Sequence, residues 1–99
     1  MDFTFTKMGA LKFISHLDLM RLFTRAMRRA RIPVKISEGF NPQPKLSILR
    51  ALKLGVESES EQATVGLREP VNAVTFRDSL NSQLPTDIRV TSACQSFSK

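Results

Sequence analysis

The sequence predicts an α+β domain in which two helices cover one face of an antiparallel sheet. Two segments place apolar residues at helical spacing, and the segments around them alternate apolar and polar residues with the two-residue period of a strand. The order along the chain is strand, helix, strand, strand, helix, strand. Because 99 residues suffice for one hydrophobic core and not for two, we expect residues 1–99 to form a single domain.

The first strand is predicted at residues 2–8. Phe3 and Phe5 alternate there with polar neighbours, a pattern typical of a strand with one buried face. Gly9 interrupts the alternation. The short apolar stretch at residues 11–14 is expected either to continue this strand or to pair with it.

The first helix is predicted from His16 to Arg31. Ser15 is the expected N-cap, and the negative charge of Asp18 suits the positive end of the helix dipole. Pro33 ends the helical pattern. One apolar stripe along this helix is expected to face the core, and it consists of Leu19, Leu22, Phe23, Ala26, Met27 and Ala30.

The middle of the chain is predicted to hold strands and one stiff loop. Residues 34–37 have the composition of a strand. Residues 38–45 contain one glycine and two prolines, which indicate a loop of restricted backbone freedom. Residues 46–54 and 62–67 are expected to form a long hairpin or two strands around an acidic turn at 57–61.

A second helix is predicted at residues 72–84, followed by a last strand at 88–93. Phe23, Met27 and Leu80 are expected to lie between the helices and the sheet. This order of elements is the split βαβ plan of a ferredoxin-like sandwich. Such a sandwich leaves the second face of its sheet open to a partner or ligand.

The charge of the chain is uneven. The formal net charge is +6, and 11 of the 15 basic residues but only three of the nine acidic residues lie within residues 1–55. A basic half of this kind favours an anionic partner, such as RNA or an acidic protein surface. A basic protein that is simply well solvated is the alternative.

Arginines line the first helix opposite its apolar stripe. Arg21, Arg25 and Arg28 recur at i, i+4 and i+7, and Arg29 and Arg31 flank them. The planar fork of an arginine suits phosphate or carboxylate, so this helix face is interpreted either as an anion-binding face or as a solvated one. The predicted anion-binding residues are Arg21, Arg25, Arg28, Arg29 and Lys45.

The stiff loop and the start of the first helix are expected to lie together. A helix between two neighbouring strands runs antiparallel to both, which would bring the end of the strand after Pro33 close to the helix start. A bound phosphate or an unstacked base is the expected ligand there. The residues expected to cluster around this ligand are His16, Phe40, Asn41, Gln43 and Lys45.

Catalytic and metal chemistry is not expected from this composition. The single cysteine, Cys94, lies at the end of the last predicted strand, where a buried thiol is the expectation. One His and one Cys do not make a zinc site, and no Gly-rich phosphate loop is present. We therefore expect no catalytic residue, no metal and no cofactor. Without a long apolar segment or a signal peptide, the protein is expected in the cytoplasm and away from membranes.

Three blocks of sequence carry a resemblance to a known family. They are SHLDLMRLFTRAMRRARIP, SEGFNPQPKLS and LKLGVESESE, at residues 15–33, 37–47 and 52–61. Together they resemble the radical-SAM-linked family of uncharacterised domains, which are fused to or encoded beside radical SAM enzymes. Members usually have His where this chain has Gln43 and usually extend further, so a truncated version of a longer member is an alternative to a stand-alone domain.

The resemblance implies a partner and not an activity. A radical SAM cluster needs three closely spaced cysteines, so a chain with one cysteine would assist such an enzyme from a separate chain or domain. We expect a non-catalytic basic accessory domain that binds RNA, such as a tRNA substrate. The alternative is a protein-interaction module that docks on the radical SAM enzyme through the open sheet face or the loop GFNPQPK. An independent enzyme that uses His16 is the third interpretation.

Overall fold

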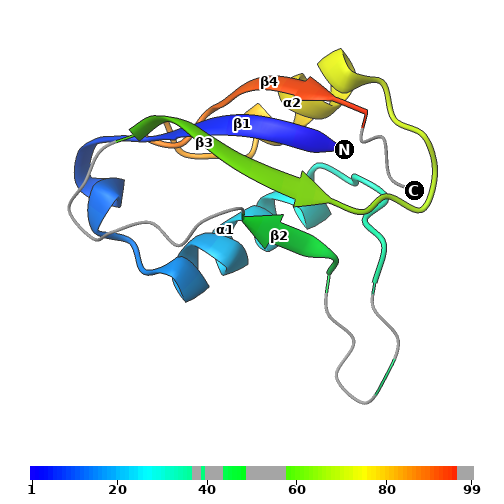
Figure 1. The fold of residues 1–99 in the computed structure, drawn as a ribbon, viewed down its shortest axis with the longest axis horizontal. Coiled ribbons are helices and arrows are strands. Elements are labelled where there is room, and N and C mark those ends of the chain that lie inside the picture. Colours follow the sequence, from blue (N-terminus) through cyan, green and yellow to red (C-terminus); the bar gives the residue numbers. More distant parts are fainter. Residues whose placement is uncertain (37–38, 40–43, 49–57, 96–99) are drawn as a thin grey trace.

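The computed structural model describes residues 1–36, 39, 44–48 and 58–95 (Figure 1). Its elements in chain order are β1 (Asp2–Lys7), the 3-10 helix η1 (Gly9–Phe13), α1 (His16–Arg29), β2 (Leu46–Ile48), β3 (Ser58–Val65), α2 (Ala73–Asn81) and β4 (Val90–Cys94). In this part of the chain, no helix has the length and apolar character needed to cross a membrane.

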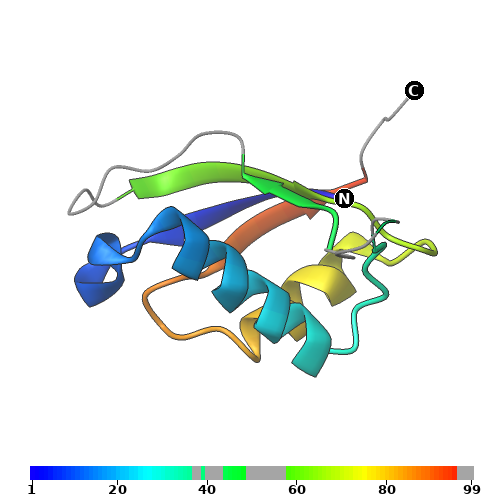
Figure 2. The same ribbon diagram turned by 90° about the horizontal axis from the view of Figure 1, so that it is seen from below.

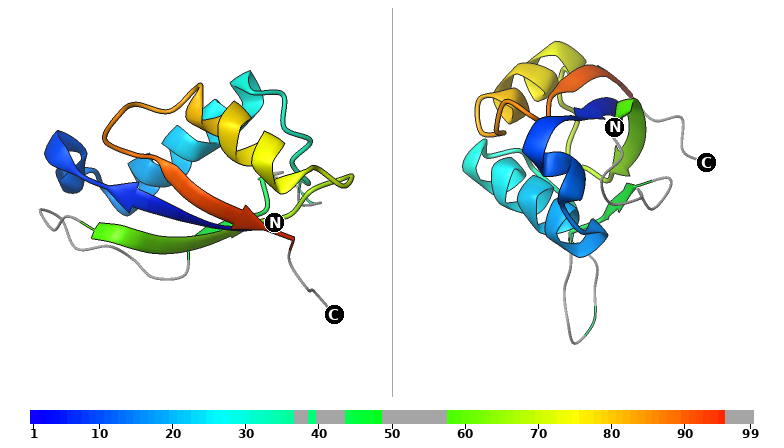
Figure 3. Two further views of the ribbon diagram at one scale, coloured as in Figure 1. Left: turned by 90° about the horizontal axis from the view of Figure 1, so that it is seen from above. Right: turned by 90° about the vertical axis from the view of Figure 1, so that its left-hand side faces the viewer.

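The described strands form one sheet in the order β2-β3-β1-β4, and every neighbouring pair is antiparallel. Both α1 and α2 lie against the same face of this sheet (Figure 2). No helix of the described residues lies on the opposite face (Figure 3). The prediction of a ferredoxin-like α+β sandwich is confirmed.

Aromatic rings hold the helices against the sheet. The ring centroid of Phe23 on α1 lies 4.9 Å from that of Phe5 and 5.6 Å from that of Phe3, both on β1. The Phe76 ring of α2 lies 5.5 Å from Phe3. These edge-to-face and tilted contacts are the geometries that aromatic pairs prefer. As predicted, Phe23 is fully buried, and so are two other residues between helices and sheet, Met27 and Leu80.

Both ends of α1 are set by local hydrogen bonds. The Ser15 hydroxyl accepts a hydrogen bond from the Asp18 amide at 3.1 Å, so the predicted N-cap is confirmed. At the other end the Ile32 amide donates to the Met27 carbonyl at 3.0 Å, and Arg31 adopts a left-handed φ of 58°. This is a Schellman motif, and it ends α1 at Arg29, before the predicted end at Arg31.

The second helix is shorter than predicted. The side-chain oxygen of Asn72 accepts hydrogen bonds from the amides of Val74 and Thr75, at 2.9 and 3.1 Å. Asn72 is therefore the N-cap, and α2 spans Ala73–Asn81 where residues 72–84 were predicted. The chain leaves the helix before Pro85 because turn hydrogen bonds replace the helical ones after Ser82.

Two predicted strands are wrong. Residues 11–14 belong largely to η1, because Gly9 turns the chain with a φ of 59° and the Ile14 amide then bonds to the Leu11 carbonyl. In the predicted strand 34–37, the described residues Val34 and Ile36 form isolated bridges, to Leu67 and Pro44. The Lys35 amide between them donates to the Gly66 carbonyl and the Lys35 carbonyl accepts from the Lys45 amide, so this segment divides its bonds between two partners.

The second strand of the sheet is instead β2, which lies within the predicted strand 46–54. Residues 49–54 of that prediction are not among those that the structure describes. The acidic turn predicted at 57–61 is also wrong from Ser58 onward. Ser58 pairs with Lys7 and Glu61 pairs with Phe5, so this segment forms the first half of β3.

The expectation of a buried cysteine is wrong as well. Cys94 is exposed at the end of β4. It pairs with Asp2 in the register of β1 and β4, and Asp2 points away from the helices together with Thr4. Cys94 therefore falls on the sheet face that no helix covers.

Candidate anion-binding face

The outward side of α1 forms one wall of a shallow groove. Leu19, Phe23, Ala26 and Met27 point into the core, so the spacing of the helix turns the arginines outward. The opposite wall consists of Leu46 of β2 and Pro44, two residues before it. This strand lies beside α1 (Figure 1). The groove is lined by His16, Leu17, Met20, Arg21, Thr24, Arg25, Arg28, Pro44 and Leu46.

Three of the predicted anion-binding residues meet in this groove. Arg21, Arg25 and Arg28 are all exposed and span about 10 Å along the helix axis, at a rise of about 1.5 Å per residue. We call these three residues the Arg face. The structure also brings His16, the first residue of α1, into the same groove.

Acidic side chains of the described residues neutralise little of the positive charge of the Arg face. Arg21 Nη1 lies 3.7 Å from Asp18 Oδ1, and both side chains are more than 60% exposed, so this ion pair is weak. No described acidic side chain forms an ion pair with Arg25 or Arg28. Their charges are therefore available to an anion from outside.

Other predicted residues lie elsewhere. Arg29 is exposed on α1 but does not line the groove. Lys45 exchanges backbone hydrogen bonds with Lys35 and Gly66, and its β-carbon packs beside Gly66. Because neighbouring residues of an extended chain point to opposite faces, Lys45 is directed away from the groove that Pro44 and Leu46 line.

The predicted cluster at the helix start is tested only in part. Phe40, Asn41 and Gln43 lie outside the described residues. The flanks of their loop, Ile36 and Pro44, line a pocket with residues of the second half of α1. These flanks lie near the C-terminal half of α1 because the loop precedes β2 in the chain, whereas the prediction had it follow the second strand.

Apolar side chains also line the groove, a feature that the sequence did not predict. Leu17 is 58% exposed, and the other apolar residues that line the groove are Met20, Pro44 and Leu46. A signal was present, because Leu17 and Met20 are apolar residues outside the core stripe and on the side of Arg21. The proximity of Leu46 could not be predicted, because it depends on the sheet.

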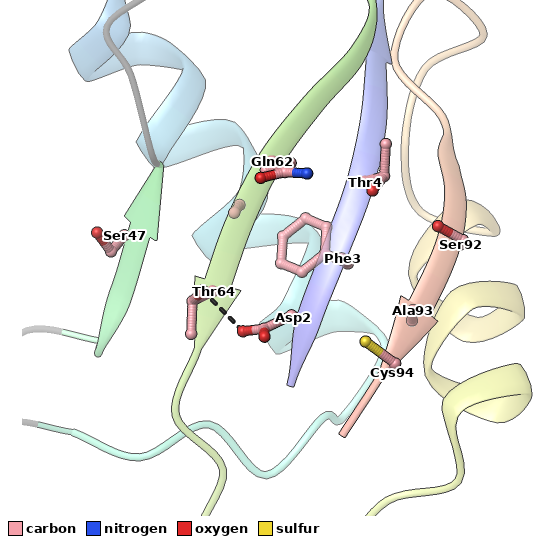
Figure 4. A pocket seen from close by; sticks show the side chains of 10 residues that line it. Asp2, Phe3, Thr4, Ser47, Gln62, Thr64, Ser92, Ala93 and Cys94 are labelled. Carbon is pink, nitrogen blue, oxygen red and sulfur yellow. Dashed lines mark hydrogen bonds between the residues drawn. The ribbon is translucent and has the colours of Figure 1, made fainter. Parts of the chain in front are cut away.

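The open sheet face differs sharply from the Arg face. Figure 4 shows a hollow on this face, lined by residues of all four strands that include the hydroxyl and amide side chains of Thr4, Ser47, Gln62, Thr64 and Ser92. The Thr64 hydroxyl donates to Asp2 Oδ1 at 2.8 Å there. Phe3 lines the hollow but is only 3% exposed, so the described part of this face offers no aromatic ring for stacking a base.

Metal chemistry finds no support among the described residues. No group of three or more His, Cys, Asp or Glu side chains lies close enough together there to hold a metal ion. The groove offers a cationic, amphipathic surface instead. The forked cations of such a surface are suited to phosphate or carboxylate.

Comparison with known protein families identifies a match. A family model described as "Uncharacterized protein conserved in bacteria (DUF2344)" matches residues 1–99. No curated protein and no solved structure matches the chain.

Proposed function

The chain belongs to the DUF2344 family of uncharacterised bacterial proteins, and from that premise we propose that it is a non-catalytic RNA-binding accessory domain. In this proposal the Arg face of α1 binds the phosphate backbone of RNA. The domain works in the cytoplasm beside a radical SAM enzyme and presents or holds that enzyme's RNA substrate, such as a tRNA.

The observation that carries the proposal is the alignment of three exposed arginines along one groove. Arg21, Arg25 and Arg28 point to the same side of a rigid helix that is capped at both ends. A preformed row of forked cations loses little conformational entropy when phosphates bind to it. The net charge of +6 adds a long-range attraction for a polyanion.

The described part of the open face has no exposed aromatic ring, which argues against RNA binding by base stacking on the sheet. RNA-binding sheets that read single strands stack bases on exposed aromatic side chains. Here Phe3, Phe5 and Phe76 are buried between sheet and helices. The proposed binding is therefore directed at phosphates and has little preference for base sequence.

The radical SAM partner is proposed from the three resembling sequence blocks alone. A chain with one cysteine needs a partner to supply the iron–sulfur cluster. Co-purification of a radical SAM enzyme with the native protein tests this part separately. If the domain binds RNA but no such enzyme is recovered, only the partner proposal falls.

Salt-dependent binding of a tRNA transcript tests the RNA proposal. Wild-type protein is expected to bind at about 50 mM salt, with an affinity that falls steeply as salt rises. Replacing Arg21 and Arg25 by Gln should reduce the slope of log K against log salt by about 0.7–0.9 for each lost phosphate contact.

The control removes one helical charge from another surface. Arg77→Gln on α2 should leave the slope close to that of wild type, because Arg77 already pairs with Asp78 and lies outside the groove. No detectable binding by the wild type at about 50 mM salt would refute the RNA proposal. Equal losses per removed charge in the Arg-face variant and the control would show that only net charge matters.

A further inference from the structure

A second pocket lies at the C-terminal end of α1, beside the groove. Its apolar wall consists of Met27, Ile32, Val34, Ile36 and Pro44. Its volume is about 260 Å³. That is below the roughly 300–1,000 Å³ of pockets for drug-sized ligands, so it matches one or two apolar side chains.

Backbone hydrogen bonds build this pocket. The Schellman motif turns the chain so that the Ile32 amide bonds to the Met27 carbonyl at 3.0 Å. Val34 then bridges to Leu67, and the Arg68 amide donates to the Pro33 carbonyl at 2.8 Å. The walls are therefore held before any ligand arrives. Even so, the apolar surface is not fully covered by described residues, because Ile36 is 47% exposed.

Two arginines stand at the rim of the pocket. Arg28 comes from α1 and Arg68 from the segment after β3, and both are exposed. No described acidic side chain lines the pocket. The C-terminal end of a helix carries only about half a negative charge, so two full positive charges make the local field favour an anion.

We propose that this pocket docks a short acidic segment of a partner protein, which inserts an apolar side chain between flanking carboxylates. The apolar wall would bury the inserted side chain, and Arg28 and Arg68 would each bind a carboxylate. RNA fits this pocket less well, because a base prefers an aromatic surface and no described lining residue is aromatic. The proposal adds a protein-docking site to the RNA-binding face and does not depend on RNA binding.

Amide chemical-shift mapping with a synthetic peptide tests the proposal. The probe is a capped hexapeptide, Asp-Glu-Leu-Phe-Asp-Glu, titrated to millimolar concentration into labelled protein. The amides of Met27, Val34 and Ile36 are expected to shift in a saturable manner. Two control peptides separate the apolar contribution to binding from the charge contribution. One replaces Leu and Phe by Ser, and the other replaces the acidic residues by their amides. Each should bind at least tenfold more weakly.

Variants of the protein locate the binding. Ile36→Asp, at a position already half exposed, and Arg68→Glu should each weaken peptide binding at least tenfold while thermal unfolding stays close to that of wild type. Arg21→Gln together with Arg25→Gln should leave peptide binding unchanged, since neither residue lines this pocket.

Several outcomes would overturn the proposal. They are the absence of shifts at these amides, equal binding of the Ser-containing peptide, and equal binding by Ile36→Asp. Shifts of the same amides on simple dilution of the protein would assign the pocket to a second copy of the chain. Loss of tRNA binding in Ile36→Asp without any peptide binding would assign it to the RNA surface.

Discussion

Lys7 is a fully buried cation at the end of β1, on the same strand face as Phe3 and Phe5. The pairing of β1 with β3 is irregular between Phe5 and Lys7, and it brings the lysine opposite Ser58. Burial lowers the pKa of Lys7 from its usual 10.5, and the nearby negative charge of Glu61 opposes this shift without cancelling it. The folded protein therefore holds the charged form of Lys7 at a cost.

This balance predicts the effect of Lys7→Met. In the wild type the unfolded chain keeps the Lys7 proton up to its ordinary pKa of 10.5, while the folded chain releases it at a lower pH. Between the two pKa values the unfolded state binds more protons, so the contribution of Lys7 to stability rises with pH there. Below the folded-state pKa the full cost is present, and Lys7→Met should be the more stable protein at pH 7.

Urea unfolding between pH 7 and about 10.5 measures this effect. The advantage of Lys7→Met over wild type should shrink as pH rises through this range. Lys35→Met, at an exposed position, serves as the control for loss of a positive charge. If Lys7→Met is less stable than wild type at pH 7, attraction to Glu61 outweighs the cost of burial.

Among the elements, α1 ends with a residue in a strained backbone region. Arg31 has a φ of 58°, which L-residues with a β-carbon adopt at a cost of roughly 1–2 kcal/mol. Glycine is the usual residue at this position of a Schellman motif. The hydrogen bonds from Arg31 and Ile32 back to the last turn compensate the strain by satisfying the carbonyls of Arg28 and Met27.

Arg31→Gly is expected to raise the free energy of unfolding by about 0.5–1 kcal/mol. Relief of the left-handed strain exceeds the extra chain entropy that glycine gives the unfolded state. The matched control is Arg29→Gly, two residues earlier and in regular helix, which should lower stability by about 1 kcal/mol. Thermal or urea unfolding measures both changes, and an equal loss in the two variants would contradict this account of the helix end.

At the scale of the whole molecule, one hydrophobic core joins both helices to the sheet. Phe23 is central because its ring contacts two rings of β1 and it is fully buried. Substituting Ala for a buried Phe leaves a cavity that close-packed neighbours cannot fill. We expect Phe23→Ala to cost about 3–5 kcal/mol in urea unfolding, a large part of the total stability of a small domain.

Phe13→Ala is the control for this prediction. Phe13 is 64% exposed in η1, and Lys12 Nζ lies 5.3 Å from its ring centroid. Loss of such an exposed contact should change stability by no more than about 0.5–1 kcal/mol. A cost below about 1 kcal/mol for Phe23→Ala would show that α1 does not pack on the sheet as described.

The parts of the fold that depend on near neighbours in the chain were predictable from sequence alone. Helical spacing located α1 and α2 and turned the arginines away from the core, because a period of 3.6 residues is a local property. The N-cap at Ser15 and the alternation of Phe3 and Phe5 are equally local. The presence of three arginines on one exposed helix face therefore followed from the sequence.

Tertiary structure decided the features that depend on distant segments. Strand pairing selected β2 over residues 34–37, because β2 pairs with β3 at three consecutive positions, whereas Val34 and Ile36 each bridge to a different segment. The register of β1 with its neighbours buried Lys7 and exposed Cys94, against the usual tendency of each side chain. The groove beneath the Arg face exists only because the sheet brings Leu46 beside α1, and no periodicity within one segment encodes that contact.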